Sequence, residues 1–259
     1  MKQSSDNEKA PTTLQTVERA LAFLEVIAQA RRPPRLKEVA QALGINVTTS
    51  YHLLNTLQLA GYLTREGDGT LRIGSRAAIV YQGLVRNFAL GRELMPVIEE
   101  LSASTGETAY IAALNREKVI IQALVEGDQA VRVTGLYVGF SGSEHIRASG
   151  KAVLAHLPDG PRDAAVGHCL PGASAAALSA AIKELENVRQ QGWALDDGHF
   201  QDGVCCVAAP FFRSGGSVAG SVSVSVPAAR FPAARERITD AVRSSARQAS
   251  ELLGHALTS

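Results

Sequence analysis

The chain has 259 residues, a formal net charge of +1, and 46% hydrophobic and 20% charged residues, which is ordinary globular composition and allows one large or two modest domains. No apolar run approaches the roughly 18 residues that a membrane span requires, so the sequence predicts no membrane partner. The three cysteines form neither a CxxC pair nor an even framework, and we therefore expect reduced thiols in a cytoplasmic protein.

Charge is distributed unevenly along the chain. Residues 1–90 carry 11 Lys/Arg and 7 Asp/Glu, a balance of +4, whereas residues 91–259 carry 15 and 18, a balance of −3. A basic front third is typical of a polyanion-binding end on a neutral or acidic body. Residues 1–13 are polar and lack the apolar segment of a secretory signal, so we expect a disordered leader there.

Two helices are predicted first. Apolar residues spaced by three and four predict a helix over 16–29, ended by "RRPPR", with one inward stripe: Val17, Ala20, Leu21, Leu24, Ile27 and Ala28. A second helix is predicted over 36–43. Gly44 follows it where a helix C-terminus favours positive φ, and Ile45 is expected to anchor the turn.

A third helix is predicted to begin after Asn46, a good N-cap residue, and to run to about Ala60. Its inward residues are expected to be Leu53, Leu54, Leu57, Leu59 and, in part, Tyr51. The segment "YLTREGDGTLRIG" then has the turn chemistry of a β-hairpin. Three helices and a hairpin predict a winged helix-turn-helix over residues 14–74.

The third helix is the predicted DNA-reading element, because a helix that enters the major groove needs short polar groups near its N-terminus. Asn55 can pair with adenine, and His52 can reach a base or a phosphate. Arg65 on the hairpin can enter the minor groove or touch phosphate. The alternative is that these residues form only a solvated helix face. The full predicted DNA-binding set is Arg31, Arg35, Lys37, Thr48, Thr49, Ser50, Tyr51, His52, Asn55 and Arg65.

A linker helix is predicted next, over about 75–87 within a linker spanning residues 75–90, followed by a break near Gly91 and a helix to Ser104 closed by Gly106. The segments "ETAYIAALN", "KVIIQALVE" and "AVRVTG" then predict an antiparallel meander. "SGKAVLAHL" predicts a helix, 159–174 is expected to be irregular with short helical pieces, and 175–192 predicts an amphipathic helix.

Two strong strands, "VCCVAAPFF" and "VAGSVSVSVP", precede a final helix over about 233–257. Strands flanked by helices at both ends predict an α+β domain of GAF or PAS type over residues 91–259, with an antiparallel sheet.

The order of these segments, with five motifs, resembles the IclR family of transcriptional regulators over about residues 14–255. The motifs are "LQTVERALAFLEVIA", "EVAQALGINVTTSYHLLNTLQLAGYL", "HIRASGKAVLAHLP", "GWALDDGHFQDGVCCVAAPFF" and "GSVSVSVP". The resemblance implies a ligand-responsive repressor or activator with a GAF-like effector domain. Its implied partners are double-stranded operator DNA, a small organic acid effector and a second copy of the chain in a homodimer, commonly a dimer of dimers.

The resemblance also implies an effector pocket. Family members that sense small oxo-acids line it with an Asp, a Cys and two Ser, which match Asp196, Cys206, Ser223 and Ser225. Ser223 and Ser225 alternate on one strand, so both hydroxyls share a face where a carboxylate can accept two hydrogen bonds, while Val222 and Val224 face the core. The alternative is that the serines lie on an exposed face of the sheet.

The loop over the family's pocket differs in this chain. His145 matches the family pattern, but Ser143 and Glu144 replace a Pro and its apolar neighbour, and Arg147 stands where a small residue is usual. Arg147 either points inward and clamps an acidic effector, or forms an ion pair with Glu144 or another acid at the rim. The effector is thus either glyoxylate- or pyruvate-like or a larger aromatic carboxylate. His52 stands where Arg is common, so the operator can differ too.

Other functional classes find little support. His145, Asp196 and Cys206 could be imagined as a nucleophilic set, but no G-x-S-x-G, H-E-x-x-H or P-loop motif is present. Adjacent Cys205 and Cys206 in an apolar strand are expected to pack on opposite faces. Metal or redox sensing would need a cluster drawn from Cys169, Cys205, Cys206, His145, His168 and His199, whose spacing gives no zinc signature. We predict no catalytic residues, cofactor or metal.

Overall fold

The computed structural model describes residues 12–115 and 118–255, so residues 1–11 of the predicted leader lie outside the described residues. The chain divides into two compact units, with the boundary between Arg86 and Asn87. In the described residues, no helix is both long and apolar enough to cross a membrane.

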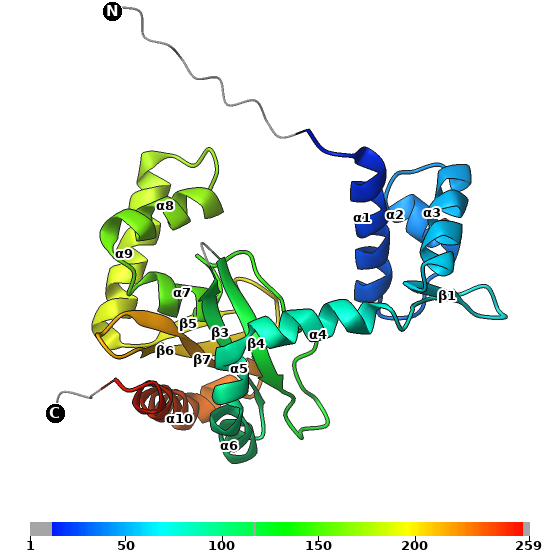
Figure 1. The fold of residues 1–259 in the computed structure, drawn as a ribbon. Helices are drawn as coiled ribbons and strands as arrows, with labels where there is room; N and C mark the ends of the chain where they lie inside the picture. The colour runs from blue at the N-terminus through cyan, green and yellow to red at the C-terminus, as the bar shows by residue number, and fades with distance from the viewer. Residues whose placement is uncertain (1–11, 116–117, 256–259) are drawn as a thin grey trace, which may run out of the picture. The chain divides into compact units, whose positions relative to one another are not determined.

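The N-terminal unit packs three helices against a β-hairpin (Figure 1). The helices are α1 (Gln15–Gln29), α2 (Leu36–Ala42) and α3 (Val47–Leu59), and β1 (Leu63–Arg65) pairs antiparallel with β2 (Leu71–Ile73). Their shared core consists of Phe23, Ile27, Leu36, Val39, Leu53, Leu54, Leu57, Leu63 and Leu71. This arrangement confirms the winged helix-turn-helix.

The turn between α2 and α3 follows the local signals in the sequence. Gly44 adopts φ +61°, the left-handed region that glycine enters without a steric penalty. The Asn46 side chain accepts a hydrogen bond from the Thr49 amide at 2.7 Å, and Ile45 packs partly buried against the core. The predicted glycine turn and N-cap are both confirmed.

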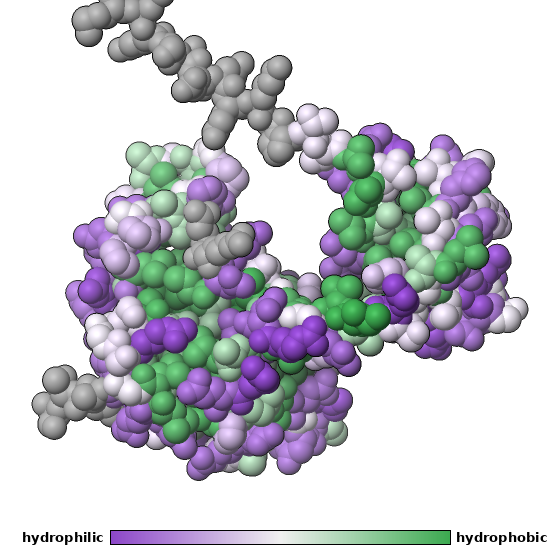
Figure 2. Space-filling model, in the orientation of Figure 1, coloured by the Kyte–Doolittle hydropathy of each residue, from purple (hydrophilic) through white to green (hydrophobic). Residues whose placement is uncertain are grey.

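The predicted inward stripe of α1 is partly wrong. Val17 and Leu21 are 51% and 55% exposed, whereas Phe23, which was not predicted, is fully buried. Leu59 of α3 was also expected inside and is 91% exposed. A unit of three short helices covers only one narrow face of each helix, so apolar residues outside that face remain at the surface. Apolar side chains accordingly gather along α1 and over α4 (Ala77–Asn87) (Figure 2).

None of the residues of α4 is buried. Two further helices follow, α5 (Ala89–Glu93) and α6 (Met95–Thr105), and Gly106 ends α6 with φ +75° as predicted. The predicted break near Gly91 is found as two interruptions, at Phe88 and Leu94. Gly91 lies inside α5, where a Cβ would stand 2.6 Å from the Gln122 carbonyl oxygen, so close backbone approach explains the glycine.

The C-terminal unit is built on a five-stranded antiparallel sheet of order β4-β3-β7-β6-β5. Its strands are β3 (Thr108–Asn115), β4 (Lys118–Val125), β5 (Ala194–Asp197), β6 (Val204–Phe212) and β7 (Val218–Pro227). Helices α6 and α10 (Phe231–Leu252) cover one face, and α7 (Ala148–Leu154) packs on the other, backed by α9 (Ala175–Gln191) and α8 (Asp159–Cys169) (Figure 1).

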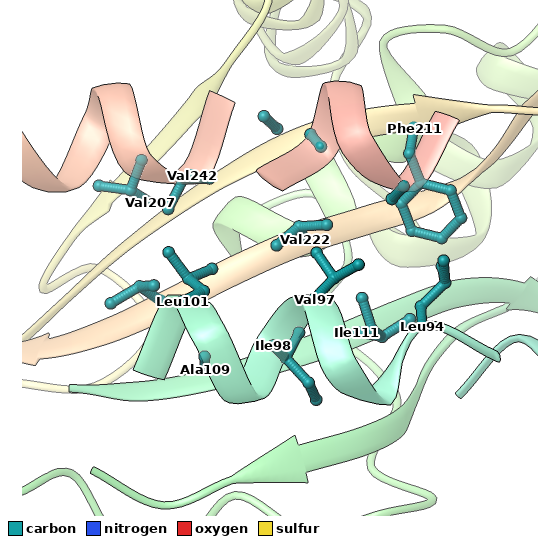
Figure 3. Packing of buried hydrophobic residues seen from close by; sticks show 14 of the residues in the cluster. Leu94, Val97, Ile98, Leu101, Ala109, Ile111, Val207, Phe211, Val222 and Val242 are labelled. Carbon is teal, nitrogen blue, oxygen red and sulfur yellow. The ribbon is translucent and has the colours of Figure 1, made fainter. Parts of the chain in front are cut away.

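The main core lies between the sheet and the α6–α10 layer. Val97 and Leu101 from α6 and Val242 from α10 meet Val207 and Val222 from the sheet (Figure 3). Because side chains alternate along a strand, Val222, Val224 and Val226 of β7 face this core and the serines between them face α7. The prediction that Val222 and Val224 face the core is confirmed.

Several predicted boundaries are corrected. Residues 130–135 form no strand, because residues 139–140 occupy the free edge of β4. Their backbone forms hydrogen bonds with the backbone of Ile121. The segment expected to be irregular contains the 11-residue helix α8; its Pro161 lies in the first turn, where a missing N–H costs nothing. Strand β5 was not predicted. The last helix begins at Phe231, two residues earlier than expected, and ends at Leu252.

Candidate DNA-binding surface and effector site

The outer face of α3 presents a row of polar side chains. Thr48, His52 and Asn55 are exposed and spaced by four and three residues, so they lie on one side of the helix. Tyr51 is 46% exposed beside them, and Thr49 is half-buried at the capped first turn. These side chains can therefore contact the same groove of a DNA duplex.

Ser50 is a correction to the predicted DNA-binding set. It is fully buried, and its hydroxyl donates to the Asn46 carbonyl at 3.0 Å. Ser50 shares its helix face with Leu53, Leu54 and Leu57, so it belongs to the inward stripe of α3. The sequence predicted Ser50 on the outer face because of its hydroxyl, although its spacing from Leu53, Leu54 and Leu57 places it on the inward face.

The predicted basic residues lie around α3 as exposed side chains. Arg31, Arg35, Lys37 and Arg65 form no side-chain ion pair with any described residue. Arg32, in contrast, pairs with Glu38, whose carboxylate also accepts from the Arg35 amide at 2.7 Å. The four unpaired cations are therefore free to bind phosphate.

In the C-terminal unit, the sheet brings together four of the predicted effector residues. Asp196, Cys206 and Ser225 stand side by side on β5, β6 and β7, and Ser223 lies two residues before Ser225 on the same face. The Cys206 sulfur and the Ser225 hydroxyl oxygen are 3.0 Å apart. Tyr110 on β3 lies opposite Ser223. We call Asp196, Cys206, Ser223 and Ser225 the sheet-face cluster.

The sheet-face cluster is buried. Ser223 and Ser225 are 0% exposed because α7 covers this face, so the alternative of serines on an exposed sheet face is wrong. Ser221 donates to the Ser149 carbonyl of α7 at 3.1 Å, whereas the Ser223 hydroxyl is buried without a hydrogen-bond partner among the described residues. An unpaired buried hydroxyl costs about 1–3 kcal/mol, which distinguishes Ser223 from an ordinary packing residue.

Asp196 is held by the turn that follows β5. Its carboxylate accepts from the amides of His199 at 2.9 Å and Phe200 at 3.2 Å. Burial raises the pKa of Asp196, and the two amide hydrogen bonds oppose that rise. The side chain therefore shapes the 197–200 turn as well as facing the cluster.

Arg147 points inward, with 4% of the residue exposed. Its guanidinium donates to the carbonyl oxygens of Gly142 at 2.6 Å and Val119 at 3.1 Å, and to the Ser149 hydroxyl at 3.4 Å. The Glu144 carboxylate is 3.9 Å away and the Phe140 ring centroid 5.0 Å away. Arg147 thus points inward, as the first alternative has it, and lies near Glu144, as the second has it, but this pair is buried and not at the rim, and the guanidinium binds protein carbonyls.

Burial also shifts the pKa values of other titratable groups in this unit. Burial lowers the pKa of His145, whose Nδ1 is buried without a partner among the described residues. Burial raises the pKa of Cys206 to about 11 and that of Cys205 to about 12. Cys205 belongs to the core facing α10 and Cys206 to the α7 side, which confirms the predicted packing on opposite faces. Among the described residues, no three His, Cys, Asp or Glu side chains group closely enough to hold a metal.

A cavity of about 600 Å³ lies next to this region and was not predicted from the sequence. It opens between the joined ends of β3 and β4, the loop 142–144 and helix α8, and we call it the α8 cavity. None of the six predicted effector residues lines it. Its lining consists of Leu114, Lys118, Gly142, Ser143, Glu144, Leu157, Pro161, Ala164, Ala165, His168 and Cys169.

Comparison with domain families identifies both units. Residues 16–67 match the family described as the IclR helix-turn-helix domain, and residues 82–251 match the family described as bacterial transcriptional regulator IclR C-terminal. The HTH-type transcriptional regulator XynR of Escherichia coli strain K12 is 29% identical over 223 residues, covering 84% of this chain and 88% of XynR.

Solved structures share the fold. The Thermotoga maritima IclR structure superimposes with a TM-score of 0.70 at 23% identity, covering 92% of this chain and 98% of that one. An IclR homologue from Microbacterium hydrocarbonoxydans, complexed with 4-hydroxybenzoate, gives a TM-score of 0.69 at 21% identity, covering 93% and 100%. The α+β effector fold with its antiparallel sheet is thus that of known regulators.

Proposed function

This chain belongs to the IclR family of bacterial transcriptional regulators, and we propose that a small carboxylic acid controls its affinity for operator DNA. It has the family's DNA-binding helix-turn-helix and its C-terminal effector domain.

The polar outer face of α3 carries the DNA-binding half of the proposal. Thr48, His52 and Asn55 lie on one exposed helix side, and the helix N-terminus is fixed by the Asn46 cap. In this proposal α3 lies in the major groove, where Asn55 pairs with adenine and His52 contacts a base or phosphate. Arg31, Arg35, Lys37 and Arg65 contact the phosphate backbone, with Thr49 and Tyr51 beside them.

The effector half of the proposal rests on the chemistry around the sheet-face cluster. The Ser223 and Ser225 hydroxyls form a buried polar group with Cys206, Asp196 and Arg147, and His145 belongs to the half-buried loop before α7. A carboxylate could accept from the serine hydroxyls, which would satisfy Ser223. The IclR homologue bound to 4-hydroxybenzoate makes an aromatic carboxylate a reasonable class beside small oxo-acids.

A homodimer, or a dimer of dimers, is part of the proposal. Leu14, the N-cap residue of α1, and Val17 and Leu21 within the helix are more than half exposed, which supports an interface between copies of the N-terminal unit. Two copies would place two α3 helices about one DNA turn apart on a pseudo-palindromic operator. Leu21→Glu should lower the mass measured by light scattering; an unchanged mass would argue against this interface.

The test is selection of binding sites from random duplexes by the full chain, followed by fluorescence anisotropy with the selected site. Asn55→Ala should cost about 1–3 kcal/mol on the selected site and little on random DNA. Lys37→Ala is the matched control: it should weaken both equally and reduce the salt dependence by about one phosphate contact. If the full chain enriches no sequence, the proposed function fails.

A further inference from the structure

The α8 cavity and the sheet-face cluster are neighbours, divided by Arg147. The guanidinium donates to the Ser149 hydroxyl of α7, the helix that covers the sheet face, and lies 3.9 Å from the Glu144 carboxylate, which lines the cavity. It is held in place by the Gly142 and Val119 carbonyl oxygens. A ligand in the cavity therefore contacts the loop that carries Arg147 without entering the closed space under α7.

The wall formed by residues 142–144 has a defined shape. Ser143 has φ 52°, the one non-glycine residue with positive φ in the described chain, and Gly142 has φ 102°. The Glu144 carboxylate accepts from the Gly142 amide at 2.9 Å, which closes this short loop on itself. Gly150 of α7 packs so tightly behind it that a Cβ would lie 2.2 Å from the Glu144 carbonyl oxygen. The loop therefore presents the Glu144 side chain to the cavity from a fixed backbone.

Glu144 is the buried polar group of the cavity, with 7% of the residue exposed. One oxygen, Oε1, is occupied by the Gly142 amide. Among the described residues, the other oxygen, Oε2, accepts only from the Cys169 thiol at 3.6 Å, and a thiol is a weak donor. Oε2 can therefore accept a stronger hydrogen bond from a ligand hydroxyl. A bare carboxylate placed here would instead meet a like charge.

The rest of the lining sets the shape and charge of the ligand. Leu114, Leu157 and Pro161 provide an apolar wall, and Lys118 supplies an exposed cation that forms no ion pair with a described residue. A volume of about 600 Å³ lies within the range of small-molecule sites, roughly 300–1,000 Å³. An oxo-acid of six heavy atoms would leave most of this apolar space unfilled.

We propose that the α8 cavity is the binding site for a hydroxy acid with an apolar body, whose hydroxyl donates to Glu144 and whose carboxylate lies toward Lys118. The cavity is a second ligand site of this domain, beside the sheet-face cluster that the proposed function assigns to the effector carboxylate. It differs from a site at the sheet-face cluster in both position and ligand: the body lies against α8, and the recognition of the hydroxyl depends on Glu144.

The experiment uses the full chain and three matched probes in calorimetric titrations: 4-hydroxyphenylacetate, phenylacetate without the hydroxyl, and 4-hydroxyphenylethanol without the carboxylate. We expect 4-hydroxyphenylacetate to bind at least about tenfold more tightly than either of the other probes. Phenylacetate loses the charge-assisted hydrogen bond to Glu144, and 4-hydroxyphenylethanol loses the ion pair with Lys118. Glu144→Gln should abolish the preference for the hydroxyl while leaving phenylacetate binding no weaker. Gln keeps an acceptor for the Gly142 amide, so the loop is retained.

Two further variants locate the site. Ala165→Phe fills the cavity from α8 and should abolish binding of all probes, with the melting temperature and operator binding confirming the fold. Arg235→Ala, at an exposed position of α10, is the matched control and should leave probe binding unchanged. Loss of binding in Ser223→Ala with retention in Ala165→Phe would overturn the proposal and place the probes at the sheet face. Absence of binding by all three probes would also overturn it, and operator binding by the same sample would show that the regulator function survives that result.

Discussion

Replacing Arg147 by alanine is expected to destabilise the C-terminal unit by about 3–5 kcal/mol. The side chain is 4% exposed and donates to two carbonyl oxygens, of Gly142 and Val119. Leaving each buried acceptor unpaired costs about 1–3 kcal/mol, and Glu144 loses the cation 3.9 Å away. The sum matches the cost of breaking a buried charge pair by removing one partner.

The single tryptophan, Trp193, gives a direct assay because it packs against the main core of the C-terminal unit. Urea unfolding followed by its fluorescence reports this unit separately, which matters because a chain with two units need not unfold in one step. Arg147→Lys should cost less, about 1–3 kcal/mol, since it keeps the charge but loses the planar fork. Arg235→Ala, at an exposed position of α10, is the control and should change stability by less than about 0.5 kcal/mol.

A shift below about 1 kcal/mol for Arg147→Ala would refute the reasoning, because it would mean that the guanidinium is not holding the two carbonyl oxygens. The size of this shift also matters for effector studies. A loss of effector response in Arg147→Ala could come from the loosened loop alone, so only variants with an unchanged Trp193 transition can assign a ligand contact to this residue.

Four other outcomes are expected. Burial raises the folded pKa of Asp196 above 3.8, so its negative charge lowers stability increasingly as pH rises from about 3.8 through the folded pKa. Asp196→Asn should therefore be more stable than the parent protein at pH 7. Urea titrations below pH 3.8 should show no such gain. With a pKa of about 11, Cys206 is about one part in a thousand thiolate at pH 8, so mass spectrometry should find it alkylated only after unfolding. Gly150→Ala should lower the melting temperature, because its Cβ would lie 2.2 Å from the Glu144 carbonyl oxygen; wild-type stability would contradict this contact. Asn46→Ala should cost about 1 kcal/mol by circular dichroism, since α3 loses its cap.

Local sequence signals predicted the elements whose causes are local. Gly44, Gly106 and Gly192 end helices with positive φ, and Asn46 caps α3, because each of these depends on a few neighbouring residues. The α+β class and the antiparallel sheet followed from the order of helical and strand-like segments. The exposure of Leu59 and the burial of Ser50 could not be predicted in this way, because they depend on which face of α3 the other helices cover.

The candidate site was predictable only where a motif marked it. The family pattern located Asp196, Cys206, Ser223 and Ser225, and the strand register places them together. The α8 cavity carries no motif: its walls come from residues near 114, 142–144 and 157–169, which meet only in the folded chain. Glu144 had one signal in the sequence, since it stands where an apolar residue is usual.

The contacts of Arg147 restrict how an effector could act on DNA affinity. The guanidinium joins β4 through Val119, the loop through Gly142 and α7 through Ser149. A ligand carboxylate that took over these donors would release the loop, and its charge-assisted hydrogen bonds would offset the cost of leaving the Gly142 and Val119 carbonyl oxygens without the guanidinium. A small net difference is enough for a switch, because coupling between an effector and DNA is typically only about 1–3 kcal/mol. A ligand confined to the α8 cavity would leave Arg147 bound and favour the arrangement in which the loop is closed. The two sites therefore predict opposite changes in loop protection, which amide hydrogen exchange at residues 139–147 would distinguish: slower exchange on ligand binding for the cavity, faster for the sheet face.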